Sequence, residues 1–293
     1  GPGLVPLGSY SISSKFVADY RRWPWLRPYQ KDVRDFIFYL QHIKHLRFFL
    51  EGFDGQGEWI NRTFEYPCRW HSARRKATLA KLYLLDEWWK ASGLPVTMMT
   101  LTTYHDWQKP HHGRPARKVR DGYSIEKSFA LLNRGWGKLH DVMTYYLGTF
   151  DYLWVLEPHQ TGYPHYHVLV FDEIPGPLQG KIRATWSERY GIAGRHQGVN
   201  FSVRPVEGLQ SARNYMMKYL EKSFSIKGLT PCQLTYHALL WRNRYRMWGS
   251  SQNLNQAMKY RRGENGVTWT SLDLQDQEGE VHEMWRLKPV STP

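Results

Sequence analysis

The sequence predicts an α+β protein with a central antiparallel sheet and helices packed against it. Several long segments carry apolar residues at helical spacing, and shorter ones rich in Val, Thr and aromatic residues are typical of strands. The middle of the chain alternates the two kinds of segment, which places helices on a sheet. Two strands flank the short turn PHQTGYP at 158–164, so we expect them to pair as antiparallel neighbours.

Hydrophobic periodicity and helix-breaking residues define the expected elements in chain order. The clearest helix begins at Ser72, a good N-cap residue, and ends just before Gly93. The expected helices are 30–50, 72–92, 124–147, 179–190, 209–224 and 231–248. The expected strands are 96–104, 150–157, 165–171 and 199–204, followed by a hairpin from 267–274 to 281–287. Residues 108–122 are basic, rich in turn formers and poor in apolar residues, which indicates a mobile surface loop.

These elements divide the chain into four regions. The opening GPGLVPLGS at 1–9 resembles the remnant of a cleaved expression tag, so it is left out of the fold prediction. We expect a mainly helical N-terminal region at 10–94 and a core at 95–225. A C-terminal extension at 226–293 is expected to contain a helix and the hairpin.

The charge of the chain points to a polyanionic partner. Its 40 Lys and Arg residues exceed 26 Asp and Glu residues, which leaves a net charge of +14 and favours a nucleic acid or an anionic membrane surface. Aromatic residues make up 15% of the chain, and rings interleaved with cations suit single-stranded nucleic acid, where bases stack and phosphates pair. No segment approaches the roughly 20 apolar residues of a membrane span, so we expect no membrane partner.

The cysteine content is too low for a disulfide framework. Cys68 and Cys232 are the two cysteines, and they lack the CxxC spacing of a metal or redox motif. A reducing compartment is the simplest interpretation, and a cytoplasmic location is expected.

Residues 161–171, TGYPHYHVLVF, carry a candidate metal site. Alternate residues of a strand face the same way, so His165 and His167 project together. Glu157 ends the preceding strand and can lean over the same face, which makes a three-point site for a hard divalent cation, Mg²⁺ or Mn²⁺. His159 is the alternative third ligand. The structural alternative is that the histidine pair binds no metal.

A second motif, YMMKYLEK at 215–222, places two tyrosines and two lysines on one helical face. Tyr215, Lys218, Tyr219 and Lys222 follow the spacing i, i+3, i+4 and i+7. A phenol with its pKa near 10 is a poor nucleophile at neutral pH. It can attack phosphorus when a metal polarises the phosphate and a nearby ammonium stabilises the phenolate. An amphipathic helix with a solvated basic face is the alternative interpretation.

The order of the motifs resembles the HUH (His–hydrophobic–His) endonucleases. The matching segments are MMTLTT at 98–103, GYPHYHVLVF at 162–171 and YMMKYLEK at 215–222, within residues 95–225. The closest subgroup is the rolling-circle replication initiators of plasmids and viruses, in their two-tyrosine form. This resemblance implies a ferredoxin-like (RRM-like) sheet with the two histidines on a central strand.

The resemblance also implies a reaction. Members of this family nick single-stranded or melted origin DNA, forming a 5′-phosphotyrosine adduct and a free 3′-OH, and later rejoin the displaced strand. Carried over to this chain, the implied residues are Tyr215 and Tyr219 as nucleophiles, Lys218 as the stabilising cation, and His165, His167 and Glu157 as metal ligands. A one-tyrosine enzyme that uses Tyr215 alone also fits.

The implied partners follow from the same family. They are single-stranded DNA or an origin hairpin, a host DNA polymerase, and a separate helicase, because the chain has no GxxxxGK[ST] motif. A prokaryotic host is expected. The residues expected to contact phosphates are Arg114, Arg117, Lys118, Arg120 and Lys222; for the first four, a solvated loop is the alternative.

Other classes remain to be compared. A transposase or a relaxase would use the same chemistry, and a non-catalytic single-strand-binding protein would use a structural HxH. A histidine-triad hydrolase needs a third alternating histidine, where this chain has Leu169. A zincin needs HExxH, and the nearest match ends in Arg286.

Overall fold

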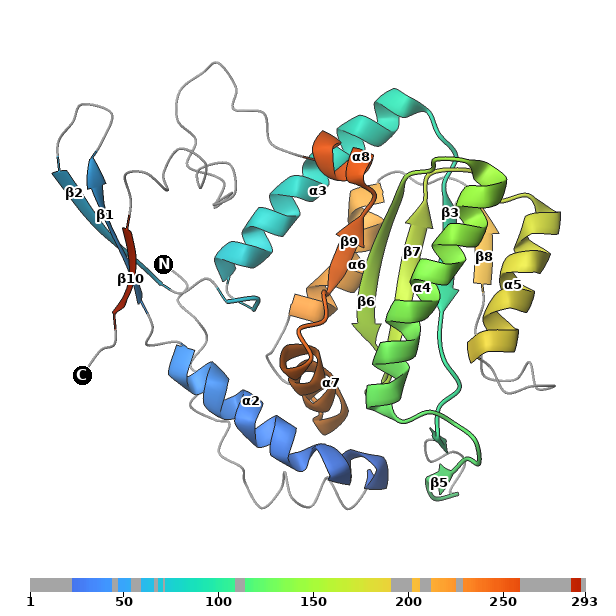
Figure 1. Ribbon diagram of the computed structural model, residues 1–293, viewed down its shortest axis with the longest axis horizontal. Helices are drawn as coiled ribbons and strands as arrows, with labels where there is room; N and C mark the ends of the chain where they lie inside the picture. Colours follow the sequence, from blue (N-terminus) through green and yellow to red (C-terminus); the bar gives the residue numbers. More distant parts are fainter. Residues whose placement is uncertain are drawn as a thin grey trace. The chain divides into compact units, whose positions relative to one another are not determined.

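The computed structural model contains two compact units (Figure 1). One comprises Gly1–Ser11, Ile37–Lys81 and Lys259–Pro293, and the other comprises Ile12–Phe36 and Leu82–Met258. The described residues are 23–43, 47–53, 59–65, 68–70, 72–108, 114–190, 202–205, 212–224, 229–258 and 286–290.

The larger unit is built on a five-stranded antiparallel sheet in the order β8-β3-β7-β6-β9. Its strands are β3 (Thr97–Leu101), β6 (Tyr152–Pro158), β7 (Pro164–Val170), β8 (Ser202–Pro205) and β9 (Trp248–Ser250). The register pairs Glu157 with His165 across β6 and β7, and Thr100 with His167 across β3 and β7. Residues directly opposite each other share a face of the sheet, so the register brings these four side chains to one side.

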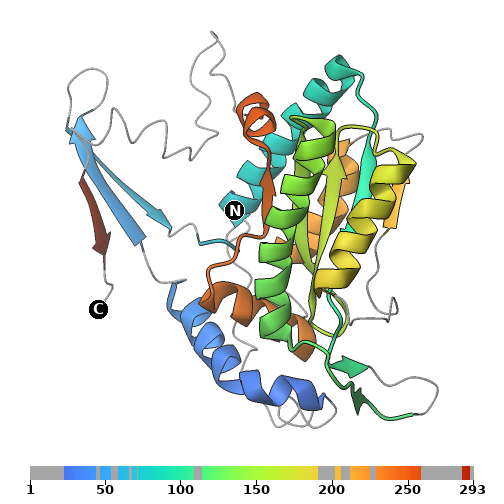
Figure 2. The same cartoon turned by 45° about the vertical axis from the view of Figure 1, so that its right-hand side comes forward.

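Helices cover both faces of this sheet. On one face lie α4 (Ile125–Leu147) and α5 (Gly176–Tyr190), which run side by side (Figure 2). Trp136 of α4 packs edge-on against Tyr152 of β6, with ring centroids 5.0 Å apart. On the other face lies α6 (Ala212–Phe224), whose Tyr219 stacks on His167. Along the chain, the core elements therefore follow the order β3-α4-β6-β7-α5-β8.

Two buried hydroxyl groups hold α6 and the next helix, α7 (Pro231–Arg242), to strand β6. Ser223 Oγ and Tyr236 Oη both donate to the carbonyl oxygen of Leu156, at 2.9 and 2.8 Å. This carbonyl immediately precedes Glu157. The position of α6 is thus tied to the strand that carries a candidate metal ligand.

The remaining elements lie outside this core. They are the 3-10 helix η1 (Pro24–Tyr29), α2 (Gln30–Ile43), α3 (Ser72–Ser92), α8 (Gln252–Ala257), and the short strands β4 (Trp107–Gln108) and β5 (Arg117–Lys118). The smaller unit contains an antiparallel sheet in the order β10-β1-β2, made of β1 (Arg47–Phe53), β2 (Trp59–Glu65) and β10 (Arg286–Val290). Within the described part of the chain, no helix is long and apolar enough to cross a membrane.

The α+β class and the antiparallel central sheet are confirmed. The helix expected at 30–50 is too long, because α2 ends at Ile43 and β1 begins at Arg47. The aromatic run RFFLEGF continues the apolar pattern of the helix, but β1 pairs with β2 and β10 instead. β2 follows directly along the chain, but β10 lies more than 200 residues away, and a local pattern does not reveal such a partner.

The helix expected at 231–248 is also shorter than predicted. It ends at Arg242, and Arg244 then adopts a positive φ of 56°, which reverses the chain and lets residues 248–250 join the sheet edge as β9. The loop expected at 108–122 contains part of the β4–β5 hairpin. The hairpin predicted at 267–287 lies outside the described residues, except that 286–287 belong to β10.

Candidate active site

Three side chains on adjacent strands bring their ligand atoms together. Nε2 of His165 and Nε2 of His167 are 2.9 Å apart, and Glu157 Oε2 is 3.0 Å from the latter and 3.7 Å from the former. Ligand atoms about 2.1 Å from one cation and at right angles to each other are separated by about 3 Å. This donor set of two imidazoles and a carboxylate therefore fits a divalent metal, and it leaves further coordination positions open.

Burial gives His165 the protonation state that a metal ligand needs. It lowers the pKa of His165 from 6.5 to about 3, with His167 adding to the effect, although Glu157 opposes it. The imidazole is thus neutral at physiological pH and its nitrogen can bind a cation. Glu157 is only 4% exposed, and buried carboxylates are stabilised by paired cations or by metals.

Thr100 orients one of the imidazoles from the neighbouring strand. Its hydroxyl lies 3.3 Å from Nδ1 of His167, on the ring edge opposite the clustered Nε2. With Nε2 as the ligand atom, Nδ1 carries the proton and donates to the hydroxyl, which fixes the tautomer and the ring orientation. Thr100 lies in the segment MMTLTT, but no local pattern there indicates this role.

The two tyrosines of α6 lie beside the cluster. The ring of Tyr219 stacks on His167 with centroids 3.9 Å apart and planes 27° apart. Its hydroxyl lies 3.4 Å from that of Tyr215, to which it donates. Tyr219 is 9% exposed and Tyr215 is more accessible. The structure therefore brings the tyrosine motif and the histidine motif onto the same face of the sheet.

The surroundings of Tyr219 hold its phenol in the neutral form. Burial raises the pKa of Tyr219, and the hydrogen bond donated to Tyr215 raises it further. Lys218 Nζ lies 5.5 Å from the centre of the Tyr219 ring. An ammonium at this distance lowers the energy of a phenolate that forms during a reaction. The side chain of Lys222 lies outside the described residues, although its backbone is part of α6.

His159, the alternative ligand, lies near the cluster but is not part of it. Its ring is 6.1 Å from that of His165, and its Nδ1 is 2.9 Å from the hydroxyl of Thr161. Among the described residues, the group whose ligand atoms converge contains Glu157 instead.

Four of the residues expected to contact phosphates lie on the β4–β5 hairpin, whereas the three ligands lie on β6 and β7. Arg114, Arg117, Lys118 and Arg120 are all exposed, and they lie on or beside strand β5. Sequence reasoning missed their neighbours His105, Asp106 and Tyr163, because no local pattern links residues so far apart in the chain.

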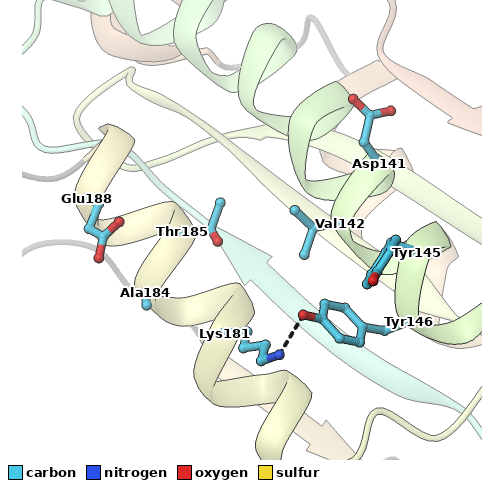
Figure 3. A pocket seen from close by; sticks show the side chains of 8 residues that line it. All are labelled: Asp141, Val142, Tyr145, Tyr146, Lys181, Ala184, Thr185 and Glu188. Carbon is cyan, nitrogen blue, oxygen red and sulfur yellow. Dashed lines mark hydrogen bonds between the residues drawn. The ribbon is translucent and has the colours of Figure 1, made fainter.

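The opposite face of the sheet has a shallow groove between α4 and α5 (Figure 3). Its volume is about 540 Å³, and its lining residues are Asp141, Val142, Tyr145, Tyr146, Lys181, Ala184, Thr185 and Glu188. Lys181 fills one side, where its Nζ donates to the Tyr146 hydroxyl at 2.5 Å. None of the residues expected to act in catalysis lines this groove.

Comparison with known protein families gives one result. Residues 96–224 match the family model described as Replication-associated protein ORF2/G2P. The match covers four of the five strands of the sheet (β3, β6, β7 and β8), helices α4 and α5, the three candidate ligands and the tyrosine helix α6. It supports a replication-associated protein, and with it a role in DNA replication. No curated protein and no solved structure matches the chain.

Proposed function

We propose that this protein initiates DNA replication by nicking single-stranded or melted origin DNA with a tyrosine. The observation that carries the proposal is the stacking of Tyr219 on His167, one of three side chains whose donor atoms suit a divalent metal. A nucleophile and a metal site on one face of one sheet are the two parts that phosphoryl transfer to a tyrosine requires. The family match supports the replication role.

The proposed reaction conserves the number of phosphodiester bonds. A tyrosine oxygen attacks the scissile phosphorus, the bond to the 3′ oxygen breaks, and the phenolic proton is finally carried by that 3′ oxygen. The products are a 5′-phosphotyrosine and a free 3′-OH. A metal bound by Glu157, His165 and His167 would supply Lewis-acid polarisation of the phosphate. Lys218 would stabilise the phenolate as its proton leaves.

Two nucleophiles fit the geometry of α6. The hydroxyls of Tyr215 and Tyr219 are 3.4 Å apart, so a phosphate within reach of one is close to the other. The first tyrosine would open the origin strand, and the second would cleave the regenerated site while the displaced strand is rejoined. This hand-over is the two-tyrosine form of rolling-circle replication.

The fold proposed for the core is that of the HUH endonucleases, a ferredoxin-like sheet. The chain order β3-α4-β6-β7-α5-β8 and the spatial order β8-β3-β7-β6 support it, because both agree with a split βαβ arrangement. A separate helicase would melt the origin, and a host polymerase would extend the 3′-OH, in the cytoplasm of a prokaryotic host.

A trapping assay tests the proposed chemistry. The protein is incubated with a randomised single-stranded DNA pool and Mn²⁺, denatured in SDS, and examined for covalent protein–DNA adducts. Tyr215→Phe, Tyr219→Phe, the double variant and a chelator are run in parallel. Tyr145→Phe on α4 is the matched control, because this exposed tyrosine lies on the other face of the sheet.

A metal-dependent adduct that the double variant loses is the expected result. If each single variant still forms some adduct, both tyrosines act as nucleophiles. If one single variant forms no adduct, the tyrosine replaced in it is the only nucleophile. DNA binding without an adduct, when metal binding is also absent, would contradict the nickase and leave a non-catalytic single-strand-binding protein.

A further inference from the structure

A short two-stranded hairpin, separate from the five-stranded sheet, follows strand β3 along the chain. We call it the arm and define it as residues 104–108 and 114–123, which include β4 and β5. Three backbone hydrogen bonds close its base: Tyr123 N to Tyr104 O, Asp106 N to Tyr123 O, and Val119 N to Asp106 O, at 2.8, 3.0 and 2.6 Å. The arm therefore has a defined position, unlike the loop that its composition predicts (Figures 1 and 2).

The packing at Gly122 makes the base of the arm tight. A Cβ atom at this position would lie 2.4 Å from the Cα of Asp106 and 2.5 Å from the carbonyl oxygen of His105. Only glycine allows this approach of two backbones. The preceding residue, Asp121, has a positive φ of 63°, which turns the chain so that Gly122 passes close to the backbone of His105 and Asp106.

The base of the arm is joined to the strand that carries the histidines. Tyr163, two residues before His165, is fully buried and its hydroxyl donates to Oδ1 of Asp106. The His105 ring stacks on Tyr163, with centroids 3.9 Å apart and planes 14° apart. The His105 ring is also 5.9 Å from that of His159. The arm and the start of β7 thus form one packed assembly.

Two tryptophans connect the arm to the turn between β6 and β7. Trp107 of β4 lies 5.7 Å from Trp25 of η1, measured between ring centroids. Trp25 is buried and its Nε1 donates to the carbonyl oxygen of Thr161, in the turn between β6 and β7. The turn between β6 and β7 is therefore held to the arm in two ways: through the contacts of Tyr163 with Asp106 and His105, and through Trp25, which contacts Trp107.

The outer surface of the arm is cationic. Arg114, Arg117, Lys118 and Arg120 are exposed, and the Arg120 side chain is 96% exposed with a marginal 3.9 Å approach to Asp121. The arm's other carboxylate, on Asp106, accepts the hydrogen bond from Tyr163. This excess of exposed cations lies on a hairpin whose base packs against Tyr163 at the start of β7, and it suits the phosphate backbone of a nucleic acid strand.

We propose that the arm determines which phosphate of the DNA strand reaches the metal ligands. Its cations hold the backbone next to the scissile phosphate, while Tyr163, Asp106 and His105 hold the arm at a fixed place relative to His165 and His167. The inference rests on the proposed nickase function and adds a positioning role for these three residues. Phosphate contacts set the register of a bound strand, and a fixed register selects one bond for attack.

The first test measures phosphate contacts by the salt dependence of DNA binding. For single strands, each phosphate contact contributes about 0.7 to the slope of log K against log salt. Lys118→Gln/Arg120→Gln is expected to reduce the slope by about 1.4. Arg134→Gln/Lys138→Gln is the charge-matched control, because both residues are exposed on α4, on the other face of the sheet. Equal slopes for the two double variants would remove the arm from the interface.

The second test measures where the strand is cut. Tyr163→Phe keeps the ring that stacks on His105 but removes the hydroxyl that binds Asp106. We expect its cuts to spread to neighbouring phosphates, with about a tenfold loss at the main site and unchanged Mn²⁺ affinity. Sequencing the DNA attached to the adduct measures this spread. Asp106→Ala is expected to act like Tyr163→Phe, and Asp106→Asn to narrow the sites again, since its amide oxygen still accepts the bond.

The outcomes separate this inference from the function on which it rests. If wild-type protein forms adducts and both Tyr163→Phe and Asp106→Ala cut at the wild-type position, the positioning role is wrong and the nickase stands. If the wild-type protein forms no adduct and also binds no Mn²⁺, the nickase and the positioning role fall together. The salt slope still reports in that case whether the arm holds DNA.

Discussion

At the scale of single residues, the site depends on how His167 is held between a carboxylate and a hydroxyl. Glu157 lies 3.0 Å from Nε2 and Thr100 lies 3.3 Å from Nδ1. The first contact gathers the ligand atoms, and the second selects the tautomer in which Nε2 is free to bind a cation. A residue outside the ligand set therefore controls its chemistry.

Replacing Thr100 tests this control. Thr100→Val keeps the shape of the side chain and removes the hydroxyl, so Nδ1–H loses its acceptor. We expect the affinity for Mn²⁺ to fall 10- to 100-fold in isothermal titration. Thr144→Val on α4 is the control, since Thr144 lies on the other face of the sheet. Equal Mn²⁺ affinities for Thr100→Val and wild type would show that Thr100 does not orient the ring.

His105 makes the stability of the protein sensitive to acid. Burial lowers the pKa of His105 from 6.5 to about 3, and the neighbouring His159 adds to the effect. As the pH falls below 6.5, the unfolded chain binds the proton first, so the folded state loses stability down to about pH 3. Its Nε2 is buried and finds no hydrogen-bond partner within the described part of the chain.

His105→Phe keeps a ring against Tyr163 and removes the titrating group. Between pH 6.5 and pH 5 we expect the wild-type protein to lose up to about 2 kcal/mol more unfolding free energy than the variant. Urea denaturation at the two pH values measures the difference. The same loss in both proteins would mean that His105 takes up a proton in the folded state.

At the scale of elements, the turn between β6 and β7 sets the spacing of the ligands. Gly162 has a φ of +87°, and a Cβ there would lie 2.6 Å from the carbonyl oxygen of Cys232. Backbone hydrogen bonds from His159 N to Tyr163 O and from Gly162 N to His159 O close the turn. The turn thus joins the two strands in the register that places Glu157 opposite His165.

Gly162→Ala is expected to be strongly destabilising. The added methyl group meets backbone atoms that cannot move aside, and alanine disfavours a positive φ, so we expect a loss of at least about 2 kcal/mol in unfolding free energy. Gly180→Ala is the matched control. Gly180 lies on α5 with open space around it, and the change is expected to stabilise the helix by about 0.5–1 kcal/mol. Urea denaturation of both variants gives the comparison.

At the scale of the whole molecule, a bound metal should stabilise the folded state. The donor atoms come from two strands and converge only when the sheet has formed. A ligand that binds only the folded protein adds about 2.7 kcal/mol at 100 times its dissociation constant. Mn²⁺ is therefore expected to raise the thermal midpoint, and a chelator to reverse the shift.

The control for this prediction is His167→Ala, which removes the central ligand. Its midpoint is expected not to respond to Mn²⁺, while Mg²⁺ and Mn²⁺ both raise that of the wild-type protein. A similar shift in wild type and variant would place the metal elsewhere in the chain.

Local sequence patterns determined the elements and the chemistry that each one carries. The helices expected at 72–92 and 124–147 follow from apolar spacing, and the first also from the breaker Gly93; α3 and α4 confirm them. The common face of His165 and His167 follows from the pleat of a strand. In each case the information lies within a few residues, where periodicity and turn chemistry act.

Tertiary structure alone decided which of those faces meet. The pairing of Glu157 with His165, the stacking of Tyr219 on His167 and the link from Tyr163 to Asp106 join residues that are far apart in sequence or are set by strand register. The end of α2 at Ile43 was likewise decided by the pairing of β1 with the next strand, β2, and with the distant strand β10. A local pattern determines which side chains share one face of a helix or strand. Burial and strand pairing over long sequence distances determine which other element packs against that face.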